Sequence, residues 1–239
     1  MKLRRTLSLL MAFWAWIALA ADTTWLHAAP ATVTAANQAA TNGVNDIINS
    51  PISGRIYTNS IGMTLIPVPG GYWAGKYEVT QKEYQQVMGT DPSAFQDEKR
   101  PVDSVSWNDA MEFCRKLTAL EIQKKFLTNN FHYCLPTEQE WQSLVADATL
   151  ESAVTSLNGG TRSQTSEVGS LAPNSLGLYD VLGNVMEFCL SDETQPFRFL
   201  KGGSWQDFVE VNLRPEFRWY CKPDDKQSNF GFRCLLKAQ

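Results

Sequence analysis

Three short helices with strong start signals constrain the fold of this chain more than any other feature of its sequence. Residues 80–83 (TQKE) form a capping box, and the helix that they open ends at Gly89. Ser106 begins a second helix, and residues 137–140 (TEQE) form another capping box that opens a third. The rest of the domain is rich in Gly, Pro and aromatic residues, so these helices interrupt a largely non-helical chain.

The second helix carries its apolar residues on one face, which indicates packing against a core. This face consists of Trp107, Ala110, Met111, Cys114 and Leu117. Strand-like segments occur at residues 63–68, 71–79, 197–205 and 229–236, and the connections between them are long. The sequence therefore predicts an α+β domain with much irregular backbone.

The first residues have the composition of an export signal. Three basic residues precede an apolar run over about residues 6–20, and small residues stand in an A-x-A spacing at Ala18 and Ala20. The run is shorter than the roughly 20 residues that a membrane span needs, and no second run follows. We predict a signal peptide at 1–20, a flexible tether at 21–53 and one domain at 54–239, in a periplasmic or secreted protein. An uncleaved N-terminal anchor is the alternative.

The predicted mature chain is acidic. Removing residues 1–20 deletes three positive charges and no negative ones, which changes the formal net charge from −4 to −7. Because the chain also has no basic run, nucleic acid is a poor fit as its partner.

All five cysteines lie in the predicted domain, at positions 114, 134, 189, 221 and 234. Thiols of an exported chain meet an oxidising compartment, where they pair. Since five is odd, at least one thiol stays free or pairs with another chain. No two of them form a C-x-x-C, which argues against a zinc knuckle or a thioredoxin-like site.

Six sequence blocks resemble one known family in their order. They are NSIGMTLIPVPGGYWAGKYEVTQKEYQQVMG, RPVDSVSWNDAMEFCRKL, LPTEQEW, PNSLGLYDVLGNVMEF, LKGGSW and GFRC. This order resembles the formylglycine-generating enzyme family, also called the sulfatase-modifying-factor family, over about residues 59–234. The resemblance implies that family's variant of the C-type-lectin-like fold, which is low in regular secondary structure.

The resemblance also locates the copper site of the family's active enzymes. Those enzymes oxidise a Cys of an unfolded sulfatase peptide to formylglycine, using oxygen and a copper ion held by two thiolates. Counting from the Ser of GGS places the two copper cysteines at Asp207 and Asn212, whereas counting back from GFRC gives Trp205 and Glu210. Because Cu(I) needs thiolates, we expect neither copper binding nor formylglycine-generating activity from either alignment.

Other catalytic sites are limited by the small number of possible ligands. Cys221 is the only thiol near the copper positions, and one thiolate is a poor copper ligand set. The chain has two histidines, His27 and His132, so the three-His iron site of the related sulfoxide synthases cannot form. We expect His132, which stands between two aromatic residues, to pack among them.

The block LYDVLGNVMEF (178–188) matches a calcium-binding segment of the family. The resemblance implies that Asp180 and Glu187 are side-chain ligands and that Gly183 and Val185 are carbonyl ligands. Such oxygens suit calcium, which is a hard cation. The alternative is that the two carboxylates only cap backbone in a turn. The family's second calcium loop is shortened here to residues 158–170, so we expect that second site to be absent.

The family also implies a structural disulfide between Cys114 and Cys234. In the chain-entropy model, closing a loop of about 120 residues contributes roughly 4–5 kcal/mol to stability. The remaining cysteines, Cys134, Cys189 and Cys221, are expected to form one bridge, with Cys189 to Cys221 preferred.

Two functions are compatible with these features. The first is an exported, non-catalytic binding or assembly module for a protein, peptide or glycan. Its C-terminal segment would present aromatic and Arg side chains for recognition, unless they pack in the core. They are Trp205, Phe208, Arg214, Phe217, Arg218, Trp219 and Tyr220.

The alternative is an oxidoreductase-type maturation enzyme acting on a protein or peptide. Family members without the cysteine pair act in this way, for example in pyoverdine biosynthesis. Its candidate groove consists of Trp205, Asp207, Glu210, Asn212 and Arg214. We favour the binding module, because no general base with a partner is evident in the sequence.

Overall fold

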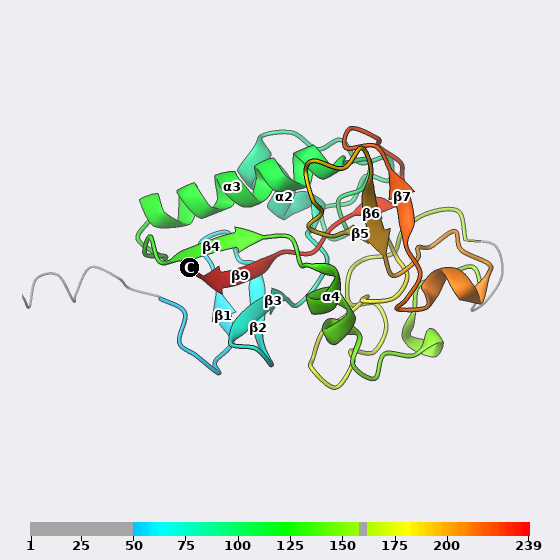
Figure 1. The fold of residues 1–239 in the computed structure, drawn as a ribbon, viewed down its shortest axis with the longest axis horizontal. Helices are drawn as coiled ribbons and strands as arrows, with labels where there is room; N and C mark the ends of the chain where they lie inside the picture. The colour runs from blue at the N-terminus through cyan, green and yellow to red at the C-terminus, as the bar shows by residue number, and fades with distance from the viewer. Residues whose placement is uncertain (1–49, 158–161) are drawn as a thin grey trace, which may run out of the picture. The chain divides into compact units, whose positions relative to one another are not determined.

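A computed structural model describes residues 50–157 and 162–239 of the chain (Figure 1). The predicted signal peptide and most of the predicted tether lie outside the described residues. Within those ranges, no helix is both long enough and apolar enough to cross a membrane.

The three predicted helices are present and begin where the capping signals indicated. They are α2 (Gln81–Met88), α3 (Trp107–Gln123) and α4 (Glu138–Val145). Each is opened by a complete capping box, in which the N-cap hydroxyl and the N3 carboxylate bond each other's backbone N–H groups. Two short 3-10 helices, η1 (Leu150–Ser152) and η2 (Glu210–Leu213), lie in the long connections.

The first sheet is antiparallel and joins the two ends of the domain. Its order is β1 (Tyr57–Thr58), β2 (Thr64–Val68), β3 (Tyr72–Gly75), β9 (Leu235–Ala238) and β4 (Phe131–Cys134). The last strand of the chain is therefore inserted between β3 and β4, and α3 packs against β4 (Figure 1).

The second sheet carries the C-terminal segment. Its order is β7 (Trp219–Cys221), β6 (Arg198–Lys201), β5 (Met186–Phe188) and β8 (Phe230–Gly231). The β5–β8 pair is parallel and the other two pairs are antiparallel. The second sheet places the GGSW and GFRC blocks close to the predicted calcium segment.

The strand predictions are right in position and wrong in extent. The predicted strand at 229–236 is two strands, β8 and β9, which belong to different sheets. The predicted strand at 197–205 ends at Lys201, because Gly202 and Gly203 turn the chain with φ of 92° and 70°. Four strands of two to four residues, β1, β4, β5 and β7, were not indicated by the sequence pattern.

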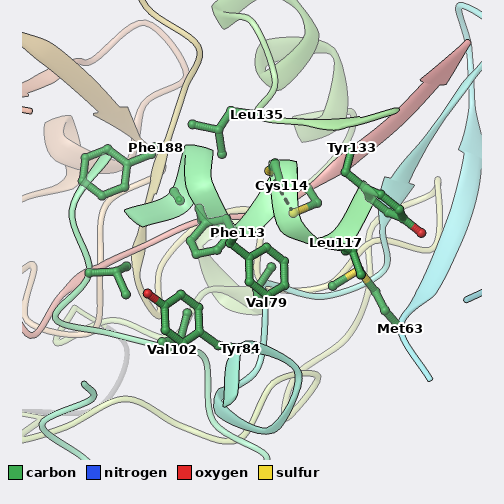
Figure 2. Packing of buried hydrophobic residues seen from close by; sticks show 14 of the residues in the cluster. Met63, Val79, Tyr84, Val102, Phe113, Cys114, Leu117, Tyr133, Leu135 and Phe188 are labelled. Atoms are coloured by element: carbon green, nitrogen blue, oxygen red, sulfur yellow. Dashed lines mark hydrogen bonds between the residues drawn. The ribbon is translucent and has the colours of Figure 1, made fainter. Parts of the chain in front are cut away.

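The core consists of two apolar clusters. The larger one lies between α2, α3 and both sheets, and in it the rings of Tyr84 and Phe113 stack at 5.6 Å (Figure 2). The smaller one surrounds Trp141 and Leu144 of α4. The predicted apolar face of α3 is buried except for Met111, which is partly exposed.

Candidate functional site

The turn after β6 brings the two predicted copper positions into contact. Asn212 Nδ2 donates a hydrogen bond to Asp207 Oδ1 at 2.6 Å. The other oxygen, Asp207 Oδ2, accepts bonds from the Ser204 N–H (2.7 Å) and the Ser204 hydroxyl (2.8 Å). The Asp207 carboxylate is buried, so it stabilises the turn through these three bonds.

These residues do not fit a copper ion. Asp207 offers carboxylate oxygens that are already bonded, and Asn212 offers an amide, whereas Cu(I) prefers thiolates. The nearby thiol, Cys221, is buried in β7, and burial raises its pKa to about 12. A single buried thiol does not supply the pair of thiolates that Cu(I) needs.

Trp205 fills the space that an active-site groove would need at this turn. Its ring is only 9% exposed and packs edge-on against Phe95, with the ring centroids 5.4 Å apart. Its indole N–H donates to the Ser228 carbonyl at 3.2 Å. Trp205 is therefore a packed residue and not an exposed recognition residue.

The candidate groove is divided between two places. Trp205 and Asp207 point inward, whereas Glu210 and Arg214 form an exposed ion pair of 3.5 Å on η2. This ion pair lies at a cavity of about 220 Å³, whose other lining residues are mainly apolar: Val145, Ala148, Thr149, Leu150, Leu182, Leu213 and Pro215. His132 is on β4 of the other sheet and does not contribute to this cavity lining.

The predicted calcium segment leads into a buried charge cluster. Glu187 Oε1 accepts hydrogen bonds from Arg233 Nε (3.0 Å) and Nη2 (2.7 Å). Glu187 Oε2 accepts one from the indole N–H of Trp141 at 2.8 Å. Arg233 also donates to the carbonyls of Gly75 (2.9 Å) and Tyr179 (2.7 Å). Both Glu187 oxygens therefore already have partners inside the protein.

Two further carboxylates complete this cluster. Asp180 Oδ2 accepts the Gly169 N–H at 2.6 Å, whereas its Oδ1 is buried without a partner among the described residues. Burial raises the pKa of Asp180 to about 6. Glu78 accepts the Val185 N–H (3.0 Å), and burial followed by the charges of Asp180 and Glu187 raises its pKa.

The sequence did not single out Glu78 or Arg233 as members of this cluster. Arg233 stands in the GFRC block, and a charged residue in that apolar run was the available signal. Glu78 also bonds the Asn184 amide at 2.7 Å, although the two residues are 106 positions apart. Contacts over such separations leave no local pattern.

The calcium ligands as placed do not form a complete site. A calcium ion at Glu187 would compete with Arg233 and Trp141 for the same oxygens. In the described part of the chain, no three His, Cys, Asp or Glu side chains are arranged to hold a metal. The Asp180 Oδ1 atom is the side-chain oxygen that lacks a protein partner here, so calcium stays a prediction.

All five cysteines are free thiols in this structure. The sulfur atoms of Cys114 and Cys234 lie 3.6 Å apart in the larger core cluster, and a bridge between them stays a prediction. The preferred pairing of Cys189 with Cys221 does not fit the sheet, because the two residues flank β6 on opposite sides. Two strand spacings separate them by roughly 9–10 Å, beyond the roughly 7 Å Cα limit for a disulfide.

The aromatic and Arg side chains of the C-terminal segment are only partly exposed. Phe208 (76%), Tyr220 (57%) and Trp219 (40%) face solvent. Arg218 bonds the Glu138 carboxylate through both Nε and Nη2. The recognition surface predicted from the sequence is therefore restricted to the η2 segment and β7.

The fold and these blocks identify the family. The chain matches the family described as "Sulfatase-modifying factor enzyme 1-like domain" over residues 58–238. It belongs to this family, which is the formylglycine-generating enzyme family, and it has the family's C-type-lectin-like fold with modest regular structure.

Named relatives of the chain include a chaperone and an inactive member of the family, as well as a formylglycine-generating enzyme. It is 30% identical over 199 residues to "Chaperone protein LppX" of Paenibacillus barcinonensis, covering 59% of this chain and 71% of that protein. It is 29% identical to "Inactive C-alpha-formylglycine-generating enzyme 2" of Mus musculus, covering 72% of this chain and 57% of the mouse protein. Among solved structures, "Treponema denticola variable protein 1" matches the fold with a TM-score of 0.63 at 24% identity, over 77% of this chain and 99% of that one.

Proposed function

We propose that this chain is an exported, non-catalytic module of the formylglycine-generating enzyme family that binds another polypeptide. The observation that carries this proposal is the Asp207–Asn212 pair. At the positions expected for the copper cysteines, a buried carboxylate is bonded to Ser204 and Asn212 and offers no soft ligand. The scaffold of the family is present, and its oxidation chemistry has no metal ligands there.

A polypeptide ligand is favoured over a glycan by two observations. One relative is named a chaperone and another an inactive member of the family, and both names suit a module that binds protein. The exposed side chains of the C-terminal segment include aromatic, aliphatic and Arg side chains, and aromatic residues and Arg are enriched in protein interfaces.

The alternative, an oxidoreductase-type maturation enzyme, needs an open polar groove at the same turn. Trp205 fills that position, and the nearby Glu210 carboxylate is exposed and paired with Arg214. Neither feature supplies the desolvated acid or base that catalysis requires.

The proposal is tested by binding of a chain that lacks tertiary structure. We expect the purified full chain to bind reduced, carboxymethylated α-lactalbumin saturably in calorimetry, because that polypeptide is soluble and extended. Native α-lactalbumin is the matched control and is expected not to bind. Equal, negligible binding of both forms would contradict the proposed function.

A further inference from the structure

We infer that the outer edge of β7, at Tyr220, is the place where an extended strand of the bound polypeptide pairs with this protein. This inference rests on the proposed function, because it names the surface and the conformation of the ligand. It follows from the register of the second sheet, from the state of the other sheet edges, and from the side chains around Tyr220.

Within residues 50–157 and 162–239, the register leaves the Tyr220 backbone without a strand partner on one side. The Cys189 N–H donates to the Phe199 carbonyl, so the Phe199 backbone groups face β5. Backbone groups alternate in direction along a strand, so the neighbours of Phe199 face β7 instead. Those neighbours pair with Trp219 and Cys221, and the N–H and C=O of Tyr220 therefore point away from the sheet.

At the other sheet edges, backbone groups bond neighbouring parts of the protein, or the edge strand is shorter than β7. At β4, the Tyr133 N–H donates to the Thr118 hydroxyl of α3 at 2.9 Å. Beside β8, the Val79 N–H donates to the Phe232 carbonyl at 2.9 Å. The remaining edge strand, β1, has only two residues. Proteins cover or shorten sheet edges to prevent unwanted pairing, so an uncovered edge with exposed aromatic residues indicates a binding surface.

The side chains around this edge are held in place before any ligand binds. The Tyr220 and Phe199 rings meet edge-on at 6.5 Å, and the Arg218 guanidinium lies 5.4 Å from the Phe199 centroid. Arg218 Nη1 donates to the Tyr220 hydroxyl at 3.2 Å. Rigid side chains lose little entropy on binding, which favours recognition.

The charges on this face indicate what the paired strand carries. Glu138 bonds both Arg218 and Lys201, so this group of three side chains has one excess positive charge. Phe197, which is 53% exposed, lies two residues before Phe199 and so on the same face of β6. Lys201 is fully buried and the charge of Asp225 acts on Cys221 of β7, so the positive charge that this edge presents is that of Arg218. The edge therefore fits an extended polypeptide with an aromatic or aliphatic residue against Tyr220 and Phe197 and an acidic residue beside Arg218.

Amide exchange in the wild-type protein tests this pairing directly. The probe is reduced, carboxymethylated α-lactalbumin at saturating concentration, and the readout is hydrogen exchange of the Tyr220 amide. We expect exchange at Tyr220 to slow at least tenfold on binding, because its N–H gains a partner. Unchanged exchange at Tyr220 alongside saturable binding would overturn this inference and leave the proposed function standing.

Two proline variants test the register independently. Tyr220→Pro removes an outward N–H together with the ring contact to Phe199 and the bond from Arg218, so we expect a melting temperature equal to that of Tyr220→Ala and at least tenfold weaker binding of the same probe than the wild type. Trp219→Pro removes an N–H that bonds β6, so we expect a lower melting temperature. Equal melting temperatures for the two variants would contradict the register.

Further variants distinguish binding at the β7 edge from binding at the exposed apolar segment near η2, which contains Phe208. Ile56→Ser removes a large exposed side chain just before β1 of the first sheet and is the control that is expected to bind the probe like the wild type, whereas Phe208→Ser removes the exposed side chain near η2 and tests that segment. If Phe208→Ser abolishes binding while Tyr220→Pro does not, the inference is wrong and the binding surface lies at η2. If the wild type binds no probe, this inference and the proposed function both fail.

Discussion

Protein groups occupy both the predicted copper position and the predicted calcium position, but the buried carboxylates at the two positions are satisfied by different kinds of partner. At the copper position, one carboxylate, Asp207, is satisfied by a hydroxyl, a backbone N–H and an amide. At the calcium position, one guanidinium, Arg233, lies among three buried carboxylates. They are Glu78, Asp180 and Glu187.

This difference indicates which position can still accept a cation. The Asp207 turn has no carboxylate oxygen without a partner, so it is a closed structural element. The Arg233 cluster has more carboxylates than cations and keeps the Asp180 Oδ1 atom without a partner in the described chain. Both Asp207 oxygens are therefore occupied at the first position, whereas metal binding remains testable at the second.

The largest loss of unfolding free energy is expected from removing Arg233, the buried cation at the predicted calcium position. Arg233→Met leaves the Glu187 carboxylate buried and without its ion-pair partner, which costs about 3–5 kcal/mol of unfolding free energy. Urea denaturation measures this loss. If the variant does not fold, Glu187→Gln, which keeps a hydrogen-bonding side chain of the same shape, is the milder test of the same pair.

Arg214→Met is the matched control for that measurement. Its ion pair with Glu210 is exposed, so its loss is expected to cost less than about 0.5 kcal/mol. A similar, small change for both arginine variants would contradict the view that the Arg233 cluster stabilises the fold.

The next largest effect is expected at the copper position. Asp207→Ala leaves the buried Ser204 donors and the half-buried Asn212 amide without this acceptor, which costs about 2 kcal/mol. Asp225→Ala is the control, because it removes a turn carboxylate that bonds only an exposed backbone N–H, and we expect a change within about 0.5 kcal/mol. The urea midpoints of the two variants decide between these values.

The smallest effect is expected from calcium. Because Glu187 would have to share its oxygens with the ion, we expect a weak site. Millimolar calcium is then expected to raise the melting temperature by roughly 1–3 °C, and a chelator to reverse the rise. Asp180→Ala should blunt this response, and magnesium is the control ion. A melting curve that does not respond to calcium removes the predicted site.

The sequence predicts the local features of this molecule well and its long-range contacts poorly. The three capping boxes lie within four residues each, and all three helices begin at them. The run at 229–236 spans two strands of different sheets, and the change of sheet occurs at residues 232–234, which are as buried as the strands on either side.

The candidate site likewise combines residues that the sequence indicated with residues that only the tertiary structure brings together. The resemblance indicated Asp180 and Glu187, which are close in sequence and both lie in the buried cluster. Arg233 joins Glu187 from 46 positions away, and Glu78 bonds Asn184 of the same segment from 106 positions away. Trp205 turns inward, where its ring packs against Phe95 and its indole N–H bonds Ser228. Such contacts depend on the tertiary structure and have no sequence periodicity.

The central claim is that this scaffold has the shape of an oxidase site without its metal ligands. Its most direct test incubates the wild-type protein with Cu(I), oxygen and a peptide containing C-x-P-x-R, and follows the peptide by mass spectrometry. A variant that combines Asp207→Cys with Asn212→Cys is run beside it and is expected to gain Cu(I) binding if the alignment is right. We predict an unchanged peptide with the wild type, and formylglycine in that peptide would contradict the account.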